Sequence, residues 1–292
     1  MRRVRLIFLA AALLVLPSCG GSSIKTDYIL AEKLWEEGSY QPAARQFERI
    51  FLKDQKGKLG QQALYRAATT QFLFLREYPE ALRLFTKYLE VAPTGPAARD
   101  AQLQIGEIYF NKTAQYENAI AHYRKWLKDN PSAPENLEFH YRIGRAQFFL
   151  WQFEDSIRSF ESVLAQSATH PATASEAAYQ IGMAHLSLAA QSPLSTRSGT
   201  EEEGVAESMD SSEWHRLAVK AFETVEKQYP GSKAAQQAAL GIVTSLEERG
   251  LWEDALKRLN EMGERYPIPQ ILKIRTHRIQ ERMSKRTTST RR

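Results

Sequence analysis

The sequence predicts an all-α fold made of about six helix–turn–helix units that stack on one another. An aromatic–x–x–Ala–x–x–x–aromatic motif recurs along the chain, and its small residue falls at positions 43, 81, 119, 156, 218 and 255. Successive copies are 37 or 38 residues apart, except for one interval of 62. Glycine precedes four of the motifs, at 106, 144, 182 and 241, and proline follows four, at 93, 131, 230 and 267. Because one such unit cannot bury its apolar side alone, several must stack.

The first residues, 1–18, have the features of a secretory signal peptide. Arg2, Arg3 and Arg5 form a basic start, and residues 6–16 are an unbroken apolar run. As a helix this run would be about 16 Å long, roughly half the hydrocarbon core of a bilayer. That length favours a signal peptide over a membrane-spanning helix. We expect residues 19–26 to form a flexible tether behind it.

The end of the apolar run, Leu16-Pro17-Ser18-Cys19, resembles the lipobox of bacterial lipoproteins, although Pro17 stands where they usually have a small residue. The resemblance implies that Cys19, the only cysteine of the chain, carries the lipid. Gly20 stands where Asp marks inner-membrane retention in enterobacterial lipoproteins, so the resemblance implies the periplasmic face of the outer membrane. Several acyl chains, at about 0.8 kcal/mol per buried CH₂, give a nearly irreversible anchor. An ordinary secretory signal with an incidental cysteine is the alternative.

The body, residues 27–267, resembles the tetratricopeptide repeat in its order of helix, turn, helix and proline. The resemblance implies that the small residues let the two helices of a unit lie close together while the aromatic residues fill the gaps between units. The link from Gln228 to Ala234 (QYPGSKA), together with Tyr266-Pro267 in the next unit, resembles envelope lipoproteins of the BamD family and the related YbgF/CpoB proteins. This resemblance covers about residues 27–283.

Two segments depart from the repeat. Residues 191–213 (QSPLSTRSGTEEEGVAESMDSSE) fall between the helices of the fifth unit, contain six acidic residues and have almost no large apolar side chain, so they predict a disordered loop. Both a solvated insertion and a partner-docking loop are consistent with this composition. Residues 268–292 predict a capping helix with a basic outer face, followed by a basic tail. Ile271, Ile274, Ile279 and Met283 are its expected apolar contacts.

Composition and motifs argue against an enzyme, a metal site and a nucleic-acid binder. Residues 19–271 hold 28 basic and 33 acidic residues, so the body is mildly acidic and lacks the basic stripe of a nucleic-acid surface. The six histidines show no i, i+3 or i, i+4 pair, and no phosphate-binding loop, dinucleotide fingerprint or nucleophile elbow occurs. We therefore expect no catalytic residues, no cofactor, no metal and no small-molecule substrate.

The expected binding surface is the groove that the first helix of each unit lines in tetratricopeptide proteins. Counting from the small residue of each first helix places side chains in that groove at three positions per unit. In the second unit these are Arg66, Thr70 and Leu73, and in the third Leu103, Glu107 and Phe110. The fourth unit gives Tyr141, Arg145 and Phe148, and the fifth Tyr179, Met183 and Leu186. Arginine would bind carboxylates or carbonyls of an extended partner, and the aromatic rings would bind its apolar side chains.

The resemblance to BamD-like lipoproteins implies a non-enzymatic scaffold for assembly of outer-membrane β-barrel proteins. Its partners would be a barrel-assembly component or unfolded segments of outer-membrane proteins, with the membrane bound through the lipid. Six units and a long acidic insertion exceed the usual five of that family. A YbgF/CpoB-like coordinator of envelope constriction is the first alternative, although no N-terminal coiled coil is predicted here. An adaptor of another envelope machine, for secretion, motility or polysaccharide export, is the second.

Overall fold

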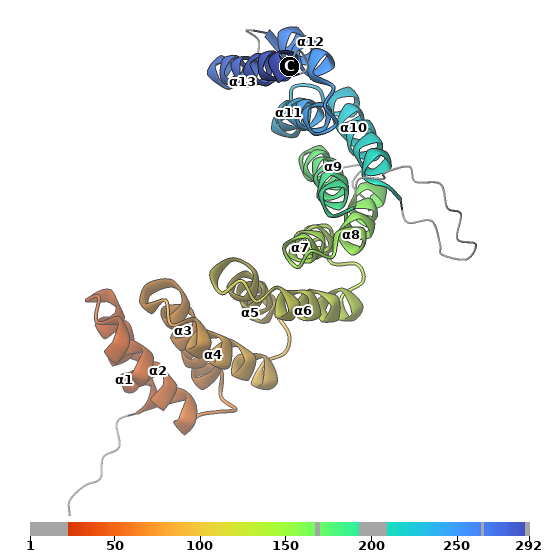
Figure 1. The fold of residues 1–292 in the computed structure, drawn as a ribbon. Coiled ribbons are helices and arrows are strands. Elements are labelled where there is room, and N and C mark those ends of the chain that lie inside the picture. The colour runs from red at the N-terminus through yellow and green to blue at the C-terminus, as the bar shows by residue number, and fades with distance from the viewer. Residues whose placement is uncertain (1–22, 167–169, 193–208, 264–265, 290–292) are drawn as a thin grey trace, which may run out of the picture. The chain divides into compact units, whose positions relative to one another are not determined.

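The computed structural model describes residues 23–166, 170–192, 209–263 and 266–289, with side chains to residue 285. Within these ranges it contains thirteen α-helices and two short π-helical segments, and no strand (Figure 1). The expected signal peptide and Cys19 lie outside the described residues. The chain divides into two compact units, 1–104 and 105–292, whose boundary falls inside α5 (Pro96–Glu107).

The first unit consists of helical hairpins packed side by side. α1 (Ile24–Glu36) pairs with α2 (Tyr40–Lys53), and α3 (Lys58–Thr70) continues into the π-helix η1 (Gln71–Leu75) and pairs with α4 (Tyr78–Val91). We call the first helix of each hairpin helix A and the second helix B. Ser23 caps α1 by accepting a hydrogen bond from the Thr26 amide, so residues 24–26 of the expected tether are helical.

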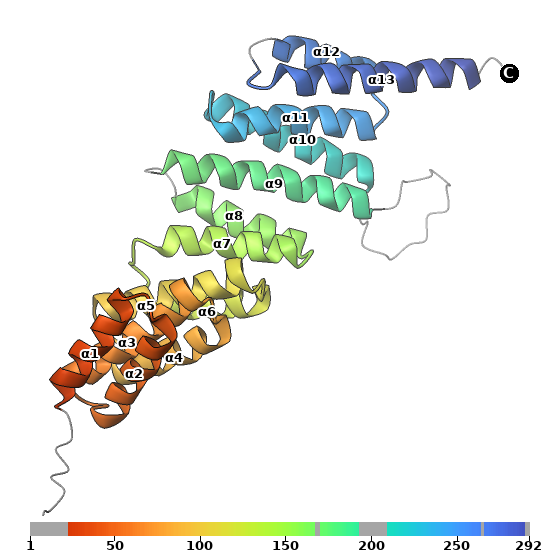
Figure 2. The same cartoon turned by 90° about the vertical axis from the view of Figure 1, so that its left-hand side faces the viewer.

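The second unit continues the same succession (Figure 2). After α5 and the π-helix η2 (Ile108–Lys112) come α6 (Tyr116–Asp129), α7 (Asn136–Phe149), α8 (Phe153–Gln166), α9 (Pro171–Gln191), α10 (Ser211–Gln228), α11 (Lys233–Glu248), α12 (Trp252–Met262) and α13 (Pro269–Ser289). Each helix from α6 onward packs on the next. The A helices of successive hairpins also contact each other, α7 with α9 and α9 with α11. The acidic stretch falls between α9 and α10. Its ends, Gln191 and 211–213, are helical, and 193–208 lie outside the described residues.

The repeat register read from the sequence is confirmed by the positions of helix B. α2, α4, α6, α8 and α12 each begin at the first aromatic residue of the motif. The small residue that follows is completely buried in all six copies. The second large residue of the motif is buried as well, with at most 2% of its surface exposed (Phe47, Phe85, Tyr123, Phe160, Phe222 and Leu259).

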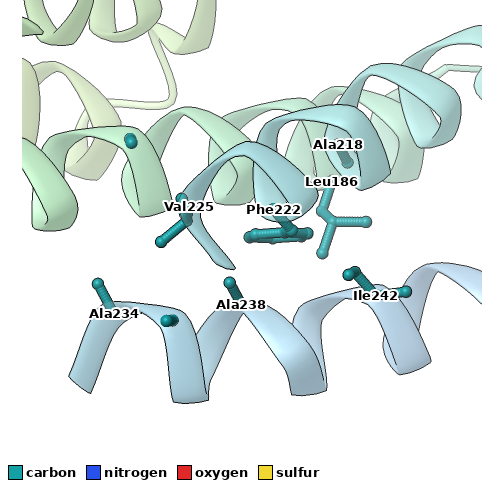
Figure 3. Packing of buried hydrophobic residues seen from close by; sticks show 9 residues of the cluster. Leu186, Ala218, Phe222, Val225, Ala234, Ala238 and Ile242 are labelled. Atoms are coloured by element: carbon teal, nitrogen blue, oxygen red, sulfur yellow. The ribbon is translucent and has the colours of Figure 1, made fainter. Parts of the chain in front are cut away.

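The glycines of helix A allow the close approach that the sequence predicted. A Cβ atom built on Gly144 would lie 2.9 Å from the Phe160 ring. Phe222 is confined from two sides, because Cβ atoms on Gly182 and Gly241 would lie 2.4 Å and 2.6 Å from opposite edges of its ring. Figure 3 shows this ring of α10 among Leu186 of α9 and Ala238 and Ile242 of α11. Any side chain at these glycines must therefore displace an aromatic ring.

Five of the turns between helix A and helix B contain a residue with a left-handed backbone. It stands five positions before the small residue of the motif in each case, and the residues are Gly38, Arg76, Ala114, Trp151 and Gly250. Gly106 precedes its turn residue by eight positions, whereas Gly144 precedes its own by seven. The additional residue lies in a π-helical turn, η2, and η1 accommodates one in the same way.

The last helix, α13, covers the end of the second unit. Its residues Leu272 and Ile279 are buried in one cluster with Val243 of α11 and Leu259 of α12. Ile274 is 59% exposed, so the expectation that it contacts the core is wrong. It follows Leu272 by two positions, which turns it about 200° around the helix axis. None of the described helices has both the length and the apolarity needed to cross a membrane.

Candidate functional site

In the second unit, two adjacent A helices hold six of the predicted groove residues, and five of them are half-buried. Tyr141, Arg145 and Phe148 lie on α7, Tyr179 and Met183 lie on α9, and all five are half-buried. The two helices pack against each other. The Tyr141 hydroxyl interacts with Gln180 of α9, and burial raises the pKa of Tyr141 above its usual range. These side chains therefore form one amphipathic face, which we call the α7–α9 face.

Arg145 supplies the cation of this face. Its guanidinium lies over the rings of Phe110 and Phe149, 5.3 Å and 5.5 Å from their centroids, and makes no ion pair within the described ranges. Phe149 in turn stacks on Tyr116 with a centroid distance of 4.8 Å. Phe110 is only 5% exposed, so its ring supports Arg145 from the core and is not open to a partner. Stacking leaves the outward N–H groups of Arg145 free to donate.

The remaining residues predicted in the second unit have structural partners. Glu107 lies 3.3 Å from Lys112 and 3.4 Å from Arg142 and accepts a hydrogen bond from Asn111. Tyr179 and Met183 also pack against the cluster around Phe222, and Leu186 is buried in it. Phe148 contacts Phe153, with ring centroids 5.1 Å apart. The face is therefore continuous with the core, and only part of each side chain is accessible.

In the first unit the predicted Arg66 has an intramolecular partner. It donates two hydrogen bonds to Glu32, of 2.9 Å and 2.6 Å, and its guanidinium lies 4.4 Å from the Trp35 ring. Thr70 is buried and donates to the Arg66 carbonyl, whereas Leu73 is 56% exposed. The guanidinium that we expected to bind a partner carboxylate thus holds α1 to α3. Leu103, also predicted to line the groove, lies on α5 and is half-buried.

Sequence reasoning missed the exposed aromatic residues at the turns. Trp151 is 71% exposed and adopts φ +62°, and Phe149 beside it is 42% exposed. Phe74 of the first unit is 39% exposed and stacks on Tyr40 at 4.3 Å. The repeat resemblance implies that aromatic residues fill the gaps between units, and the exposed Trp151 departs from that. The repeat register aligns Trp151 with Gly38 and Gly250, and this alignment could have predicted that Trp151 lies in a turn.

Among the described residues, one cluster combines a hydroxyl, an imidazole and a carboxylate, and its serine and histidine are buried. His215 Nδ1 lies 3.1 Å from Ser245 Oγ, and His215 Nε2 lies 3.6 Å from a Glu248 carboxylate oxygen. Ser245 is completely buried and His215 is 5% exposed. Burial lowers the pKa of His215, with Arg249 as a second cause. The cluster joins α10 to α11. Among the described residues, no group of three or more His, Cys, Asp or Glu side chains is placed to hold a metal ion.

Comparison with known families decides the nature of the repeat. A family model described as "Tetratricopeptide repeat" matches residues 70–134. Residues 70–134 therefore match this family, and the described helices have the fold of tetratricopeptide-repeat proteins. The all-α tetratricopeptide fold predicted from the sequence is therefore confirmed. A search of curated protein sequences gives no significant match.

Two solved structures share the fold at low sequence identity with TM-scores above 0.5, and a third is similar at a lower score. A tetratricopeptide repeat protein from Parabacteroides merdae ATCC 43184 is 14% identical, with a TM-score of 0.51 over 83% of this chain and 79% of that one. The structure of Naa15/Naa10 bound to HypK-THB matches with a TM-score of 0.56 at 13% identity, over 88% of this chain and 34% of that chain. MamA from Desulfovibrio magneticus RS-1 is 15% identical, with a TM-score of 0.46 over 73% and 98% of the two chains.

Proposed function

We propose that this protein is a non-enzymatic scaffold that binds protein partners through its tetratricopeptide repeats. Stacked repeats offer extended surfaces on which a peptide or helix can lie. The observation that carries the proposal is the α7–α9 face. There an arginine that has no acidic partner among the described residues lies beside Tyr141 and among half-exposed apolar side chains. Arginine and aromatic residues are the types enriched at the energetic centres of protein interfaces.

The proposed location is the periplasmic face of the outer membrane, with Cys19 as the lipid anchor. The support comes from the sequence alone: the basic start, the apolar run of residues 6–16 and the lipobox-like Leu16-Pro17-Ser18-Cys19. Gly20 supports the outer membrane over the inner one. Together with the BamD-like link after α10, these features support a role in assembly of outer-membrane β-barrel proteins.

The anchor is tested by fractionation. The Cys19→Ala chain should leave the membrane pellet and appear in the soluble periplasmic fraction, because it lacks the acyl chains that hold it at the bilayer. Mass spectrometry of the unaltered protein should show the added lipid on Cys19. An altered chain that stays in the membrane fraction to the same extent would contradict the anchor.

The scaffold role is tested by purification from detergent-solubilised membranes and mass spectrometry of the co-purifying proteins. A β-barrel protein with periplasmic domains, recovered in near-equal amount, is the expected result. Arg145→Gln should reduce that recovery with little change in melting temperature. Arg158→Gln is the matched control, because Arg158 lies on helix B (α8), is exposed and, within the described structure, pairs with Asp155 of its own helix.

Other partners would redirect the proposal. Recovery of peptidoglycan synthases without a β-barrel protein would favour the coordinator of envelope constriction. Recovery of secretion, motility or polysaccharide-export proteins would favour an adaptor of that machine. In both cases the BamD-like link would reflect the ancestry of the fold only.

A further inference from the structure

The first helix, α1, carries two large aliphatic side chains on its exposed side. Ile29 is 69% exposed and Leu30 is 49% exposed. The opposite side of the helix holds the buried Ala31, which faces the rest of the first unit. Two neighbouring aliphatic residues open to solvent at the start of a repeat fold call for an explanation, because terminal repeats need a polar outer side to be soluble.

In later repeats the position of Leu30 is covered by the preceding helix B. Leu30 stands eight residues before the left-handed residue of its turn, and Ile143 and Ile242 stand eight residues before theirs. Ile143 and Ile242 are 4% and 5% exposed. Ile242 lies in one buried cluster with Phe222 of α10, the helix B before it (Figure 3). Leu30 therefore has the residue type and the position of a contact between repeats.

The position of Ile29 faces the preceding helix B as well. Arg142 and Gly241 occupy this position in their own A helices, nine residues before the left-handed turn residue. Arg142 donates to the Tyr123 hydroxyl of α6 over 3.4 Å, and a Cβ atom on Gly241 would lie 2.6 Å from the Phe222 ring of α10. No described helix precedes α1, so its aliphatic pair occupies the surface on which an earlier repeat would pack.

The last helix, α13, ends the repeats with a polar side instead. α11 packs on the cluster that includes the following helix B through Leu240 and Val243. The residues 37 positions later, on α13, are His277 and Gln280, and both are exposed. A second copy stacked head to tail would bring Ile29 against these polar groups. Another copy of the chain is therefore a poor match for the exposed side of α1.

The chain before α1 brings this side close to the expected anchor. Cys19 lies five residues before Ile24, the first residue of α1. Five residues extend at most about 18 Å. A lipid on Cys19 would therefore hold the first turns of α1 within that distance of the bilayer surface, whatever the conformation of the intervening residues.

The charges on the exposed side of α1 match an anionic bilayer at the end nearer the anchor. Lys25 and Lys33 flank Ile29 at intervals of four, so the three residues form one stripe along the helix. Lys33 lies 3.8 Å from Glu37, but both side chains are more than half exposed, so the pair is weak. Glu36 and Glu37 stand at the C-terminal end of the helix, farthest from Cys19. Anionic headgroups attract lysines at the membrane surface.

We propose that the exposed side of α1 (Lys25, Ile29, Leu30 and Lys33) lies on the bilayer, with its aliphatic side chains among the acyl chains and its ammonium groups at anionic headgroups. The inference rests on the proposed anchor at Cys19. Contacts of this size bind a bilayer weakly and reversibly, so the lipid retains the chain and α1 orients the first hairpin. The Cys19→Ala chain is therefore still expected in the soluble fraction.

The first experiment measures binding without a lipid on the protein. Residues 19–292 with Cys19→Ala are mixed with vesicles of phosphatidylglycerol and phosphatidylcholine, and the bound fraction is followed as lipid is added. Ile29→Ser together with Leu30→Ser should weaken this binding about tenfold, because it removes the aliphatic groups that enter the bilayer. Lys25→Gln should weaken it about fivefold, and only when phosphatidylglycerol is present. Melting temperatures should stay unchanged, since these side chains are exposed.

Leu73→Ser is the matched control for the aliphatic pair. Leu73 belongs to the same unit and is 56% exposed. It precedes Phe74, whose ring lies 5.2 Å from that of Trp35 near the end of α1. It therefore lies near the end of α1 that is farther from Cys19, and its replacement should leave vesicle binding unchanged.

The second experiment identifies what covers the helix. Cys19 is the only cysteine of the chain, so a maleimide phospholipid couples residues 19–292 to the same vesicles at that position. p-Benzoylphenylalanine replaces Ile29 in one preparation and Leu73 in another. After illumination, mass spectrometry should find phospholipid on the peptide with the probe at position 29, in at least tenfold higher yield than at position 73. The same two probes are then illuminated in cells that produce the full-length chain.

Three results would overturn the proposal. They are equal phospholipid yields at the two probe positions, vesicle binding that is unaffected by replacing the aliphatic pair, and a cross-link in cells from position 29 to a partner protein or a second copy. The vesicle experiments couple the chain chemically, so they do not depend on lipidation in the cell. A chain that binds vesicles through α1 but carries no lipid on Cys19 in cells would contradict the proposed anchor and leave the bilayer contact standing.

Discussion

The guanidinium of Arg66 on α3 lies between the carboxylate of Glu32 and the indole of Trp35, both on α1. Four further arginines pair with a glutamate of the preceding hairpin: Arg83 with Glu48, Arg142 with Glu107, Arg258 with Glu226, and Arg275 with Glu247. In every case the acid belongs to the earlier hairpin and the arginine to the later one. These pairs therefore fix the packing of neighbouring repeats beyond what the apolar contacts supply.

Replacing Arg66 should loosen the first hairpin. Arg66→Ala removes a two-pronged ion pair and a cation–π contact, and we expect a loss of about 2 kcal/mol in unfolding free energy. Arg66→Lys keeps the charge but not the fork, so about half of that loss should remain. Chemical denaturation of both variants checks this. Arg49→Ala, an exposed arginine on α2, is the control and should change stability little.

The confinement of Phe222 makes a second prediction. Gly182→Ala should destabilise the protein by about 1–3 kcal/mol, because its methyl group would enter the space of a ring that Gly241 blocks on the far side. In an unobstructed helix the same change would stabilise by about 1 kcal/mol.

A double-mutant cycle shows whether the ring is the cause. Phe222→Leu frees space at both glycines, so adding Gly182→Ala to it should cost clearly less than adding it to the unaltered chain. Equal costs in the two backgrounds, measured by denaturant unfolding, would mean that the ring is not what excludes the methyl group.

The repeat was predictable because the same physical demand recurs six times. Each unit needs a small residue where helix B approaches helix A and a large one to fill the next gap, so Ala119 and Tyr123 repeat what Ala43 and Phe47 do. The groove was less predictable. The periodic count gives the direction of Arg66 and Phe110, but not that Glu32 binds the first or that the core covers the second. Those outcomes depend on residues about 35 positions away, whose pairing has no periodic signature.

Trp151 gives a third prediction, because it combines exposure with backbone strain. Gly38 and Gly250 occupy the same turn position at no steric cost, whereas a left-handed conformation costs a tryptophan about 1–2 kcal/mol. Since its side chain is 71% exposed, little burial is lost on removing it. Trp151→Gly should therefore raise the unfolding free energy by about 1 kcal/mol. A decrease would show that its contact with Phe153 outweighs the strain. Because the substitution removes a tryptophan, unfolding of both chains is followed by circular dichroism and not by tryptophan fluorescence.

Burial of histidines predicts the pH dependence of stability. Desolvation lowers the pKa of His140, His185 and His215 below the ordinary value of 6.5, and Arg249 adds to the effect at His215. As the pH falls through 6.5, the unfolded chain binds protons that the folded chain does not, so the folded state loses stability. Burial raises the pKa of Glu226 and Glu248, which works in the opposite direction. Those carboxyls bind protons first in the folded state, between their raised values and about 4.5, and offset part of the loss there.

His185→Phe isolates one of these contributions. His185 stacks on Trp214 with a centroid distance of 5.5 Å, and its buried Nδ1 has no hydrogen-bond partner in the described structure. Phenylalanine keeps a stacked ring and removes the titrating group. The melting temperature should be unchanged or higher near pH 7.5, and its fall between about pH 7.5 and about pH 5.5 should be smaller than in the unaltered chain. His277→Gln, at an exposed position of α13, is the control. If both variants lose as much stability as the unaltered chain, burial of His185 is not a source of the acid sensitivity.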